Sequence, residues 1–304
     1  VGDIESLPFL EAIRQMRLDA GDNNVLYLHL TLVPYIKTSG ELKTKPTQHS
    51  VKALREIGIQ PDILLCRSDD VLPDEIRSKI ALFCNVRMDR VISAPDVTNI
   101  YELPLVFHDQ GLDQQILEVL DIWTGRARLE PWRHMLQQWE SAEQSVKIAV
   151  VGKYVHLSDT YKSLHEALKH GGIPSGASVE LSYIDAEALN QKNSTELLGN
   201  MDGILVPGGF GERGIEGKIQ AIRFAREKKV PFFGICLGMQ LAVIEFCRHV
   251  LGEKKANSRE FTPDAESCCI ELMNEQQEVT NMGGTMRLGA YLCNLRKDSL
   301  AQNI

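Results

Sequence analysis

Apolar runs of strand length alternate with amphipathic stretches in the second half of the chain. Four segments are expected to be strands: 147–154, 178–185, 202–209 and 231–236. The stretches 159–172 and 216–229 have the apolar spacing of helices, and a third helical pattern begins at Leu237. Strands separated by helices of about ten to fifteen residues pair in parallel through right-handed crossovers. The second half is therefore expected to form a parallel sheet flanked by helices.

The first half is also a mixture of helices and strands. Helices are expected over 8–21 and 50–58, strands over 25–34 and 61–68, and a strand followed by a loop over 91–104. The charged segment 124–145 contains two tryptophans and is interpreted as a connector that packs on a domain surface. The pattern predicts an α/β protein of two domains, each with a mainly parallel sheet.

Composition and charge are those of an ordinary globular chain. Its 304 residues are 43% hydrophobic and 24% charged, which is enough for two domains with separate cores. No apolar run approaches the length of a membrane span, so no membrane association is expected. A net charge of −8 argues against binding of nucleic acid along an extended surface. Seven scattered cysteines, with Cys268 and Cys269 adjacent, are typical of a reducing, cytoplasmic setting.

The segment Gly234-Ile235-Cys236-Leu237-Gly238 has the layout of a nucleophile elbow. An apolar strand ends there, and a helical pattern begins directly after the cysteine. Flanking glycines suit a turn that is too tight for β-carbons, and the helix N-terminus favours the thiolate. An isolated cysteine is more often a small core residue, but the glycine context favours a nucleophile.

A glycine-rich turn, VPGGFG, occupies residues 206–211 at the end of another predicted strand. Taken alone, it could equally be a plain strand-to-helix turn. In a parallel sheet, however, this turn and Cys236 both lie at carboxyl ends of strands, where ligands bind. The turn is therefore expected to supply oxyanion-hole amides. Cys236 would attack an amide carbon, release ammonia from the thioester stage, and be regenerated by hydrolysis.

Motifs along the whole chain resemble those of CTP synthases. PGGFG, GICLGMQ and GGTMRLG (283–289) resemble the glutamine amidotransferase domain of that family, although GICLGMQ alone would indicate only a class I glutamine amidotransferase. VGDIESLPFLEAIRQ at the start and GELKTKPTQHSV at 40–51 resemble its amidoligase, or synthetase, domain. The resemblance implies a P-loop-like amidoligase portion, a linker and a flavodoxin-like amidotransferase portion, over residues 1–122, 123–145 and 146–304.

The resemblance also implies roles in the amidotransferase half. Cys236 matches the nucleophile, and Glu260 matches a carboxylate that binds glutamine, where it could hold the α-ammonium group. Arg259 stands where the family usually has threonine, and an ion pair between Arg259 and Glu260 would weaken glutamine binding. The other glutamine-binding and oxyanion positions match Gly209, Leu237, Gly238, Met239 and Gln240.

The KTKPTQ segment provides cations, hydroxyls and an amide on a proline-containing turn before a helix. Triphosphate oxygens favour such an arrangement, although a lone Lys-x-Lys is more often a solvated loop. The resemblance implies that this segment binds UTP or CTP, together with a lysine further along and an acidic segment at the start. The residues are Lys43, Thr44, Lys45, Pro46, Thr47, Gln48, Lys79, Asp3, Ile4 and Glu5.

A separate segment matches the family's contact with the adenine of ATP. It consists of Pro95, Asp96 and Val97, of which Pro95 could contribute only a carbonyl because it has no N–H. The resemblance also implies Mg²⁺ between the nucleotide phosphates, but the sequence leaves the metal-binding residues unknown.

Two parts of a complete enzyme are missing from this sequence. A cysteine amidotransferase needs a histidine base, which the family carries in a His-x-Glu pair far beyond the nucleophile. The only later histidine, His249, lies 13 residues along the same helix, about 20 Å from Cys236, and is too distant to be the base. The glycine-rich phosphate loop of the synthetase domain is also absent. We therefore expect an interior fragment that is largely inactive alone.

The function implied by the resemblance is ATP-dependent amination of UTP to CTP with ammonia from glutamine. A homotetramer, inhibition by the product CTP and activation by GTP are expected on the same ground. Two alternatives stay open. One is a class I glutamine amidotransferase with another acceptor, which would leave KTKPTQ and GGTMRLG unexplained. The other is a catalytically dead nucleotide-binding scaffold, which the missing histidine would fit.

Overall fold

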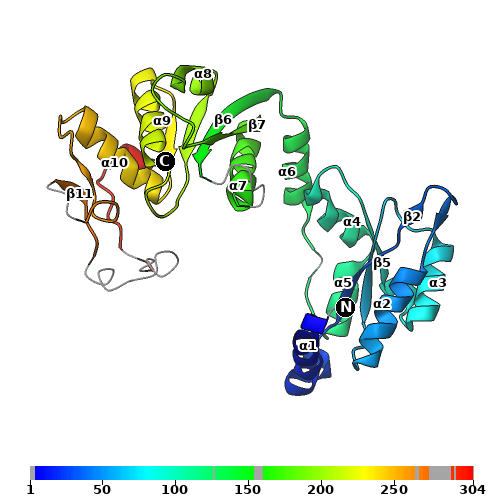
Figure 1. Ribbon diagram of the computed structural model, residues 1–304. Coiled ribbons are helices and arrows are strands. Elements are labelled where there is room, and N and C mark those ends of the chain that lie inside the picture. Colours follow the sequence, from blue (N-terminus) through cyan, green and yellow to red (C-terminus); the bar gives the residue numbers. More distant parts are fainter. Residues whose placement is uncertain are drawn as a thin grey trace. The chain divides into compact units, whose positions relative to one another are not determined.

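The chain forms two compact units, Val1–Gln137 and Gln138–Ile304 (Figure 1). The structure is a computed structural model that describes residues 4–125, 127–153, 160–263, 267–273, 289–290 and 292–303. Each unit contains a parallel sheet with helices packed against it, so the predicted α/β class is confirmed.

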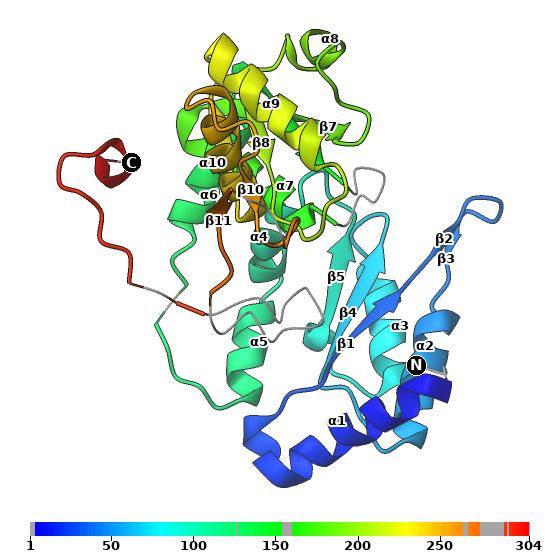
Figure 2. The same ribbon diagram turned by 60° about the vertical axis from the view of Figure 1, so that its left-hand side comes forward.

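The sheet of the first unit has three parallel strands in the order β1 (Leu28–Leu32), β4 (Ile63–Ser68) and β5 (Val91–Pro95). Helices α2 (Lys45–Glu56) and α3 (Asp74–Cys84) cover one face and bury Leu64 and Cys66. Helices α4 (Leu103–Asp109) and α5 (Leu112–Val119) cover the other face, against Ile63 (Figure 2). Strand β4 is buried on both sides, which explains its nearly continuous apolar sequence.

Helix α1 (Leu7–Ala20) and several short elements complete the first unit. The short elements are η1 (Ile4–Ser6), η2 (Asp22–Asn24), β2 (Tyr35–Ile36), β3 (Glu41–Leu42), η3 (Met88–Arg90) and η4 (Ile100–Glu102). Strands β2 and β3 pair as an antiparallel hairpin.

Two predictions for the first unit were wrong in detail. Helix α2 begins at Lys45, so Pro46 lies in its first turn and not in a turn before it; a proline is favourable there because first-turn amides have no partner inside the helix. The region expected to be a loop after β5 contains η4 and α4. Asn99 and Glu102 form a capping box there, a signal that was present in the sequence.

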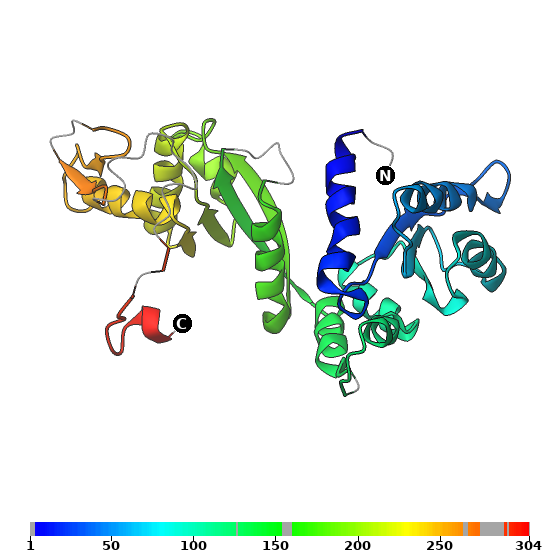
Figure 3. The same cartoon turned by 90° about the horizontal axis from the view of Figure 1, so that it is seen from below.

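The sheet of the second unit has four parallel strands. Their spatial order is β7 (Ala177–Asp185), β6 (Gln144–Gly152), β8 (Gly203–Val206) and β9 (Phe232–Gly234). If the four strands are numbered by their order in the sequence, their spatial order is 2-1-3-4, the arrangement of a flavodoxin-like sheet. Helices α9 (Ile215–Lys228) and α10 (Leu237–His249) pack on it through Ile219 and Leu241, while α7 (Lys162–Gly172), green in Figure 3, packs along β7.

The remaining elements of this unit are short. They are η5 (Ile173–Ser175), α8 (Ser194–Leu198), β10 (Asn257–Ser258), β11 (Cys268–Ile270) and α11 (Leu300–Asn303). Strands β10 and β11 pair in parallel with an irregular register. Every helix in the described ranges is too short or too polar to cross a bilayer.

The segment predicted to be a connector contains helix α6 (Glu130–Glu140). The border between the two units falls inside this helix. Trp132 Nε1 donates to the carbonyl of Tyr101 in the first unit over 2.8 Å. Trp139 makes an edge contact with His170 in the second unit, with ring centroids 6.2 Å apart. The two tryptophans of the connector therefore pack in different units.

Candidate active site

Cys236 occupies a strained turn between β9 and α10. Its φ of 53° and ψ of −106° are unfavourable for any residue with a β-carbon. The flanking backbone leaves no room for side chains: a β-carbon at Gly234 would lie 2.6 Å from the carbonyl carbon of Gly238, and one at Gly238 would lie 2.1 Å from the oxygen of Val206. The turn thus has the geometry expected of a nucleophile elbow.

The side chain of Cys236 is exposed and lines a cavity of about 520 Å³. Three other residues predicted to bind glutamine line the same cavity, namely Gly209, Gln240 and Glu260. Ser258 and Glu271 also line it. The fold therefore brings the elbow, the glycine-rich turn and the segment around Glu260 together, although they are distant in sequence.

Backbone amides beside Cys236 are available to stabilise negative charge. Gly208 is so close that a β-carbon on it would lie 3.4 Å from the Cys236 β-carbon. Within the described ranges, the N–H groups of Gly209 and Leu237 donate to no other protein group. Both N–H groups therefore fit the role predicted from the sequence, donation to an oxyanion at Cys236. Of the other predicted positions, Gly238 is buried and Met239 is 58% exposed, outside the cavity lining.

Glu260 and Arg259 have different partners. Glu260 Oε1 accepts a hydrogen bond from the N–H of Gly211 over 3.2 Å. Arg259 donates to both carboxylate oxygens of Glu271, over 3.0 Å from Nε and 2.7 Å from Nη2. This hydrogen-bonded pair lowers the pKa of Glu271. The pair between Arg259 and Glu260 that the sequence suggested is not formed, because Arg259 reaches across to Glu271, on the segment just after β11.

Two buried lysines beneath the glycine-rich turn were not identified from the sequence. Lys153, directly after β6, is 9% exposed, and its Nζ donates to the carbonyls of Phe210 and Gly211. Lys218, on α9, is 1% exposed, and its Nζ lies 3.9 Å from the position of a β-carbon at Gly209. Burial lowers the pKa of both, to about 8 for Lys218. Lys218 does have a sequence signal, because it falls on the apolar face of its helix.

In the first unit, the three residues predicted to contact adenine line one cavity. Pro95 is the last residue of β5, and Asp96 and Val97 follow it directly. The three line a cavity of about 720 Å³ whose other walls are mainly apolar. Arg67, the penultimate residue of β4, pairs with Asp96 over 3.3 Å. Sequence reasoning missed Arg67, although a cation at the end of an apolar strand is a recognisable signal.

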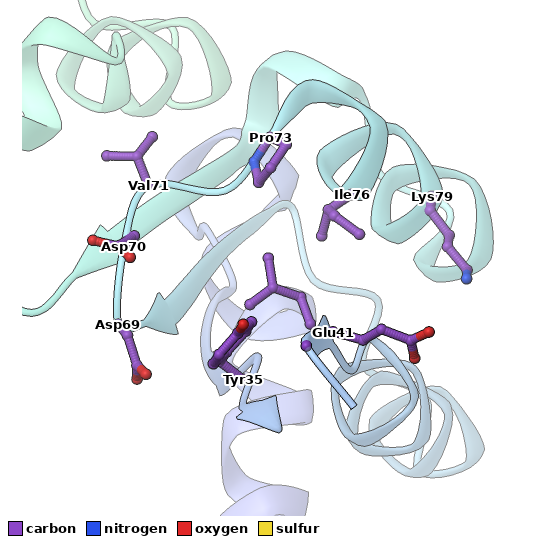
Figure 4. A pocket seen from close by; sticks show the side chains of 10 residues that line it. Tyr35, Glu41, Asp69, Asp70, Val71, Pro73, Ile76 and Lys79 are labelled. Carbon is purple, nitrogen blue, oxygen red and sulfur yellow. The ribbon is translucent and has the colours of Figure 1, made fainter. Parts of the chain in front are cut away.

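A second cavity of the first unit, of about 580 Å³, contains Lys79 (Figure 4). Tyr35 and Glu41 of the β2–β3 hairpin, and Asp69 and Asp70 after β4, also line it. Lys43 Nζ pairs with Glu41 over 2.5 Å, and this hydrogen bond, with a smaller contribution from Lys79, lowers the pKa of Glu41. Two of the predicted nucleotide-binding lysines therefore face the same carboxylate.

The remaining residues of KTKPTQ are divided between structural and exposed positions. Thr47 is buried, and its hydroxyl donates to the carbonyl of Leu32 over 3.1 Å, which ties α2 to β1. The hydroxyl of Thr44 accepts a hydrogen bond from Gln48 over 3.1 Å. Lys45 and Pro46 are exposed in the first turn of α2. Any contact of Thr47 with phosphate would use its backbone amide, one of the first-turn N–H groups that helices offer to anions.

The predicted acidic segment is only partly described. Asp3 lies outside the described residues, as do residues 283–288 of the GGTMRLG motif. Ile4 and Glu5 lie in η1, which leads into α1, and Glu5 is exposed.

Comparison with known proteins covers both units. Residues 1–122 match the CTP synthase N-terminus, and residues 156–303 match class-I glutamine amidotransferase. The CTP synthase of Syntrophus aciditrophicus (strain SB) is 60% identical over 301 residues, which are 99% of this chain and 56% of that protein. The chain belongs to the CTP synthase family. The predicted resemblance to this family is confirmed for both halves and for their order along the chain.

Other relatives give the same result at similar identity. The CTP synthase of Geobacter sulfurreducens is 57% identical over 303 residues, covering 99% of this chain and 56% of that protein. The chain thus spans little more than half the length of these curated relatives. Among solved structures, the glutaminase domain of Trypanosoma brucei CTPS with bound acivicin is 41% identical, with a TM-score of 0.41, over 42% of this chain and 50% of that chain.

Proposed function

We propose that this chain is part of an enzyme that aminates UTP to CTP, using ammonia released from glutamine at Cys236. The observation that carries the proposal is the convergence of Cys236, Gly209, Gln240 and Glu260 on one cavity. Family membership supports the synthetase half of the reaction, and so does the cavity that holds Pro95, Asp96 and Val97.

Glutamine would bind with its side-chain amide beside the elbow and its α-ammonium group at Glu260. The Cys236 thiolate attacks the amide carbon, and the tetrahedral oxyanion accepts hydrogen bonds from the N–H groups of Gly209 and Leu237. Once the leaving nitrogen has gained a proton, which the histidine of the family's His-x-Glu pair would supply, the intermediate collapses to ammonia and a thioester. Water then hydrolyses the thioester to glutamate and frees the thiol. His249 does not act as the base, since it pairs with Glu245 over 3.3 Å at the far end of α10.

In the first unit, we propose that ATP places its adenine in the cavity lined by Pro95, Asp96 and Val97. Lys43, Lys45 and Lys79 would bind the phosphates of UTP, or of CTP as an inhibitor. ATP phosphorylates the uracil 4-oxygen, and ammonia then displaces phosphate to give CTP. Phosphorylation is needed because the uracil oxygen alone is a poor leaving group.

Mg²⁺ is proposed to enter together with the nucleotides. In the described part of the chain, no group of three His, Cys, Asp or Glu residues could hold a metal ion. Mg²⁺ usually keeps several waters and binds substrate phosphates with one or two carboxylates, so a complete protein cage is not required. A homotetrameric assembly, activation by GTP and a cytoplasmic location are supported by the family resemblance alone.

The decisive test is Cys236→Ala in the full-length protein. This variant should lose glutamine-dependent CTP formation but keep CTP formation from added ammonia, because only the glutaminase step uses the thiol. Cys293→Ala, at another exposed cysteine, is the matched control and should change neither rate. Loss of both activities in Cys236→Ala, or of neither, would contradict the assignment.

The same assay separates the two alternatives. An amidotransferase with another acceptor would hydrolyse glutamine at Cys236 but form no CTP from UTP and ammonia. A nucleotide-binding scaffold would do neither.

A further inference from the structure

One peptide group of the glycine-rich turn is held from both sides. The carbonyl of Phe210 accepts a hydrogen bond from Lys153 Nζ over 2.5 Å, and the N–H of Gly211, in the same peptide group, donates to Glu260 Oε1 over 3.2 Å. Lys153 Nζ also donates to the carbonyl of Gly211 over 3.1 Å. Three hydrogen bonds with charged side chains therefore act on two consecutive peptide groups.

These bonds determine how the peptide plane is oriented. In a trans peptide the C=O and N–H groups point in opposite directions, so Lys153 and Glu260 hold opposite edges of the plane. The peptide cannot rotate without breaking both charge-assisted bonds. The preceding residues, Gly208 and Gly209, have no side chains to restrict their backbone, and glycines reach many conformations at low cost.

We propose that Lys153 is a positioning residue for glutamine hydrolysis, because it holds the Phe210–Gly211 peptide so that the Gly209 N–H stays directed at the oxyanion beside Cys236. The inference rests on the proposed glutaminase function of this site. It also gives Glu260 a second role: one oxygen holds the turn, and the other stays available for the substrate ammonium.

The surroundings of Lys153 support a role beyond packing. The side chain is almost fully buried, and burial lowers its pKa, as does the nearby charge of Arg213. The negative charges of Glu260 and Glu187 raise the pKa of Lys153, but by less. The second buried lysine, Lys218, also lies close to the turn. Placing an ammonium group here is costly, and an apolar side chain of similar length would avoid that cost.

The test compares Lys153→Met with Lys147→Met in the full-length protein. Lys147 is exposed on β6, the strand that Lys153 directly follows, and serves as the matched control. In Lys153→Met, the glutaminase kcat should fall by about 100-fold, as for loss of an oxyanion donor, while KM for glutamine changes less than about threefold. CTP formation from ammonia should be unchanged, which shows that the protein is folded. Lys153→Arg, which keeps the charge, should recover part of kcat.

A second measurement addresses the turn directly. Hydrogen exchange of the Gly211 amide, followed by NMR in this chain, should be faster in Lys153→Met than in the native sequence or in Lys147→Met. If Lys153→Met does not fold, Lys153→Gln takes its place in both experiments.

The outcomes separate this inference from the proposed function. If the native protein forms no CTP from glutamine, the proposed function fails, and the exchange experiment still decides whether Lys153 holds the turn. If the native protein is active and Lys153→Met keeps kcat within about twofold, or the Gly211 amide exchanges at an unchanged rate, the role of Lys153 is refuted.

Discussion

Lys218 shows how much a single buried charge matters at the residue scale. It is 1% exposed on α9 and has no hydrogen-bond partner within the described residues. Burial lowers its pKa to about 8, with a further contribution from the charge of Lys153. Replacement of an unpaired buried charge by an apolar side chain of similar volume removes the cost of desolvation.

We therefore expect Lys218→Met to be more stable than the native protein at pH 7, by about 1–3 kcal/mol in the free energy of unfolding. The lysine has a pKa of about 8 in the folded protein and about 10.4 in the unfolded chain. Between these pH values the unfolded chain binds more protons than the folded protein, so the stability of the native protein rises with pH. The difference in stability between Lys218→Met and the native protein therefore shrinks as the pH rises. Urea unfolding of both proteins at pH 7 and pH 9.5 measures the difference in their free energy of unfolding at each pH. Lys228→Met, exposed on the same helix, is the control and should show no such trend. An advantage that does not depend on pH would argue against a charged Lys218.

At the scale of elements, the contact between β8 and the start of α10 determines how tightly the chain turns at Cys236. Gly238 lies against Val206, and a β-carbon there would approach the Val206 carbonyl oxygen to 2.1 Å. This close packing lets helix α10 begin at Leu237, directly after Cys236. The sequence pattern already indicated the elbow, because Gly234 and Gly238 flank the cysteine at the spacing that this tight turn requires.

Gly238→Ala is expected to lower the free energy of unfolding by about 2 kcal/mol or more, since the helix must move away from the strand. Gly171→Ala in α7 is the control: nothing lies within 4 Å of its new β-carbon, and a helical alanine should gain about 0.5–1 kcal/mol. Chemical denaturation of both variants measures the difference. Equal effects at the two positions would show that the contact with Val206 is not limiting.

At the scale of the whole molecule, the proposed glutamine site and the proposed nucleotide site belong to different units. The cavity at Cys236 lies in Gln138–Ile304, whereas Lys45, Lys79 and Asp96 lie in Val1–Gln137. The two half-reactions should therefore respond to different substitutions.

We expect Lys45→Ala in the full-length protein to raise KM for UTP by about tenfold or more, because an exposed first-turn cation is lost from the proposed phosphate site. Glutamine hydrolysis measured without nucleotides should not change. Lys192→Ala, exposed in the second unit, is the control and should affect neither quantity. Unaltered UTP kinetics in Lys45→Ala would remove this residue from the proposed site.

Much of the fold and part of the site could be predicted from the sequence. The four strands of the main sheet of the second unit, and helices α7, α9 and α10, were predicted to within a few residues, because their apolar periodicity is strong and glycines mark several of their ends. The short elements α8, β10, β11 and α11 were not predicted. Helix α2 was predicted to begin too late, because the proline of KTKPTQ was interpreted as a turn and not as a first helical turn. The capping box of Asn99 and Glu102 was overlooked in the same way.

The sequence by itself determined the α/β class, the family and the position of Cys236 in its elbow. These depend on local patterns, and a chain carries its local patterns before it folds. Only the tertiary structure decided that Arg259 pairs with Glu271 and that Lys153 and Lys218 are buried beside the glycine-rich turn. It also decided that Arg67 lines the same cavity as Pro95, Asp96 and Val97. Lys153 and Phe210 are 57 positions apart, and such contacts arise only when the sheet brings the ends of its strands to one edge.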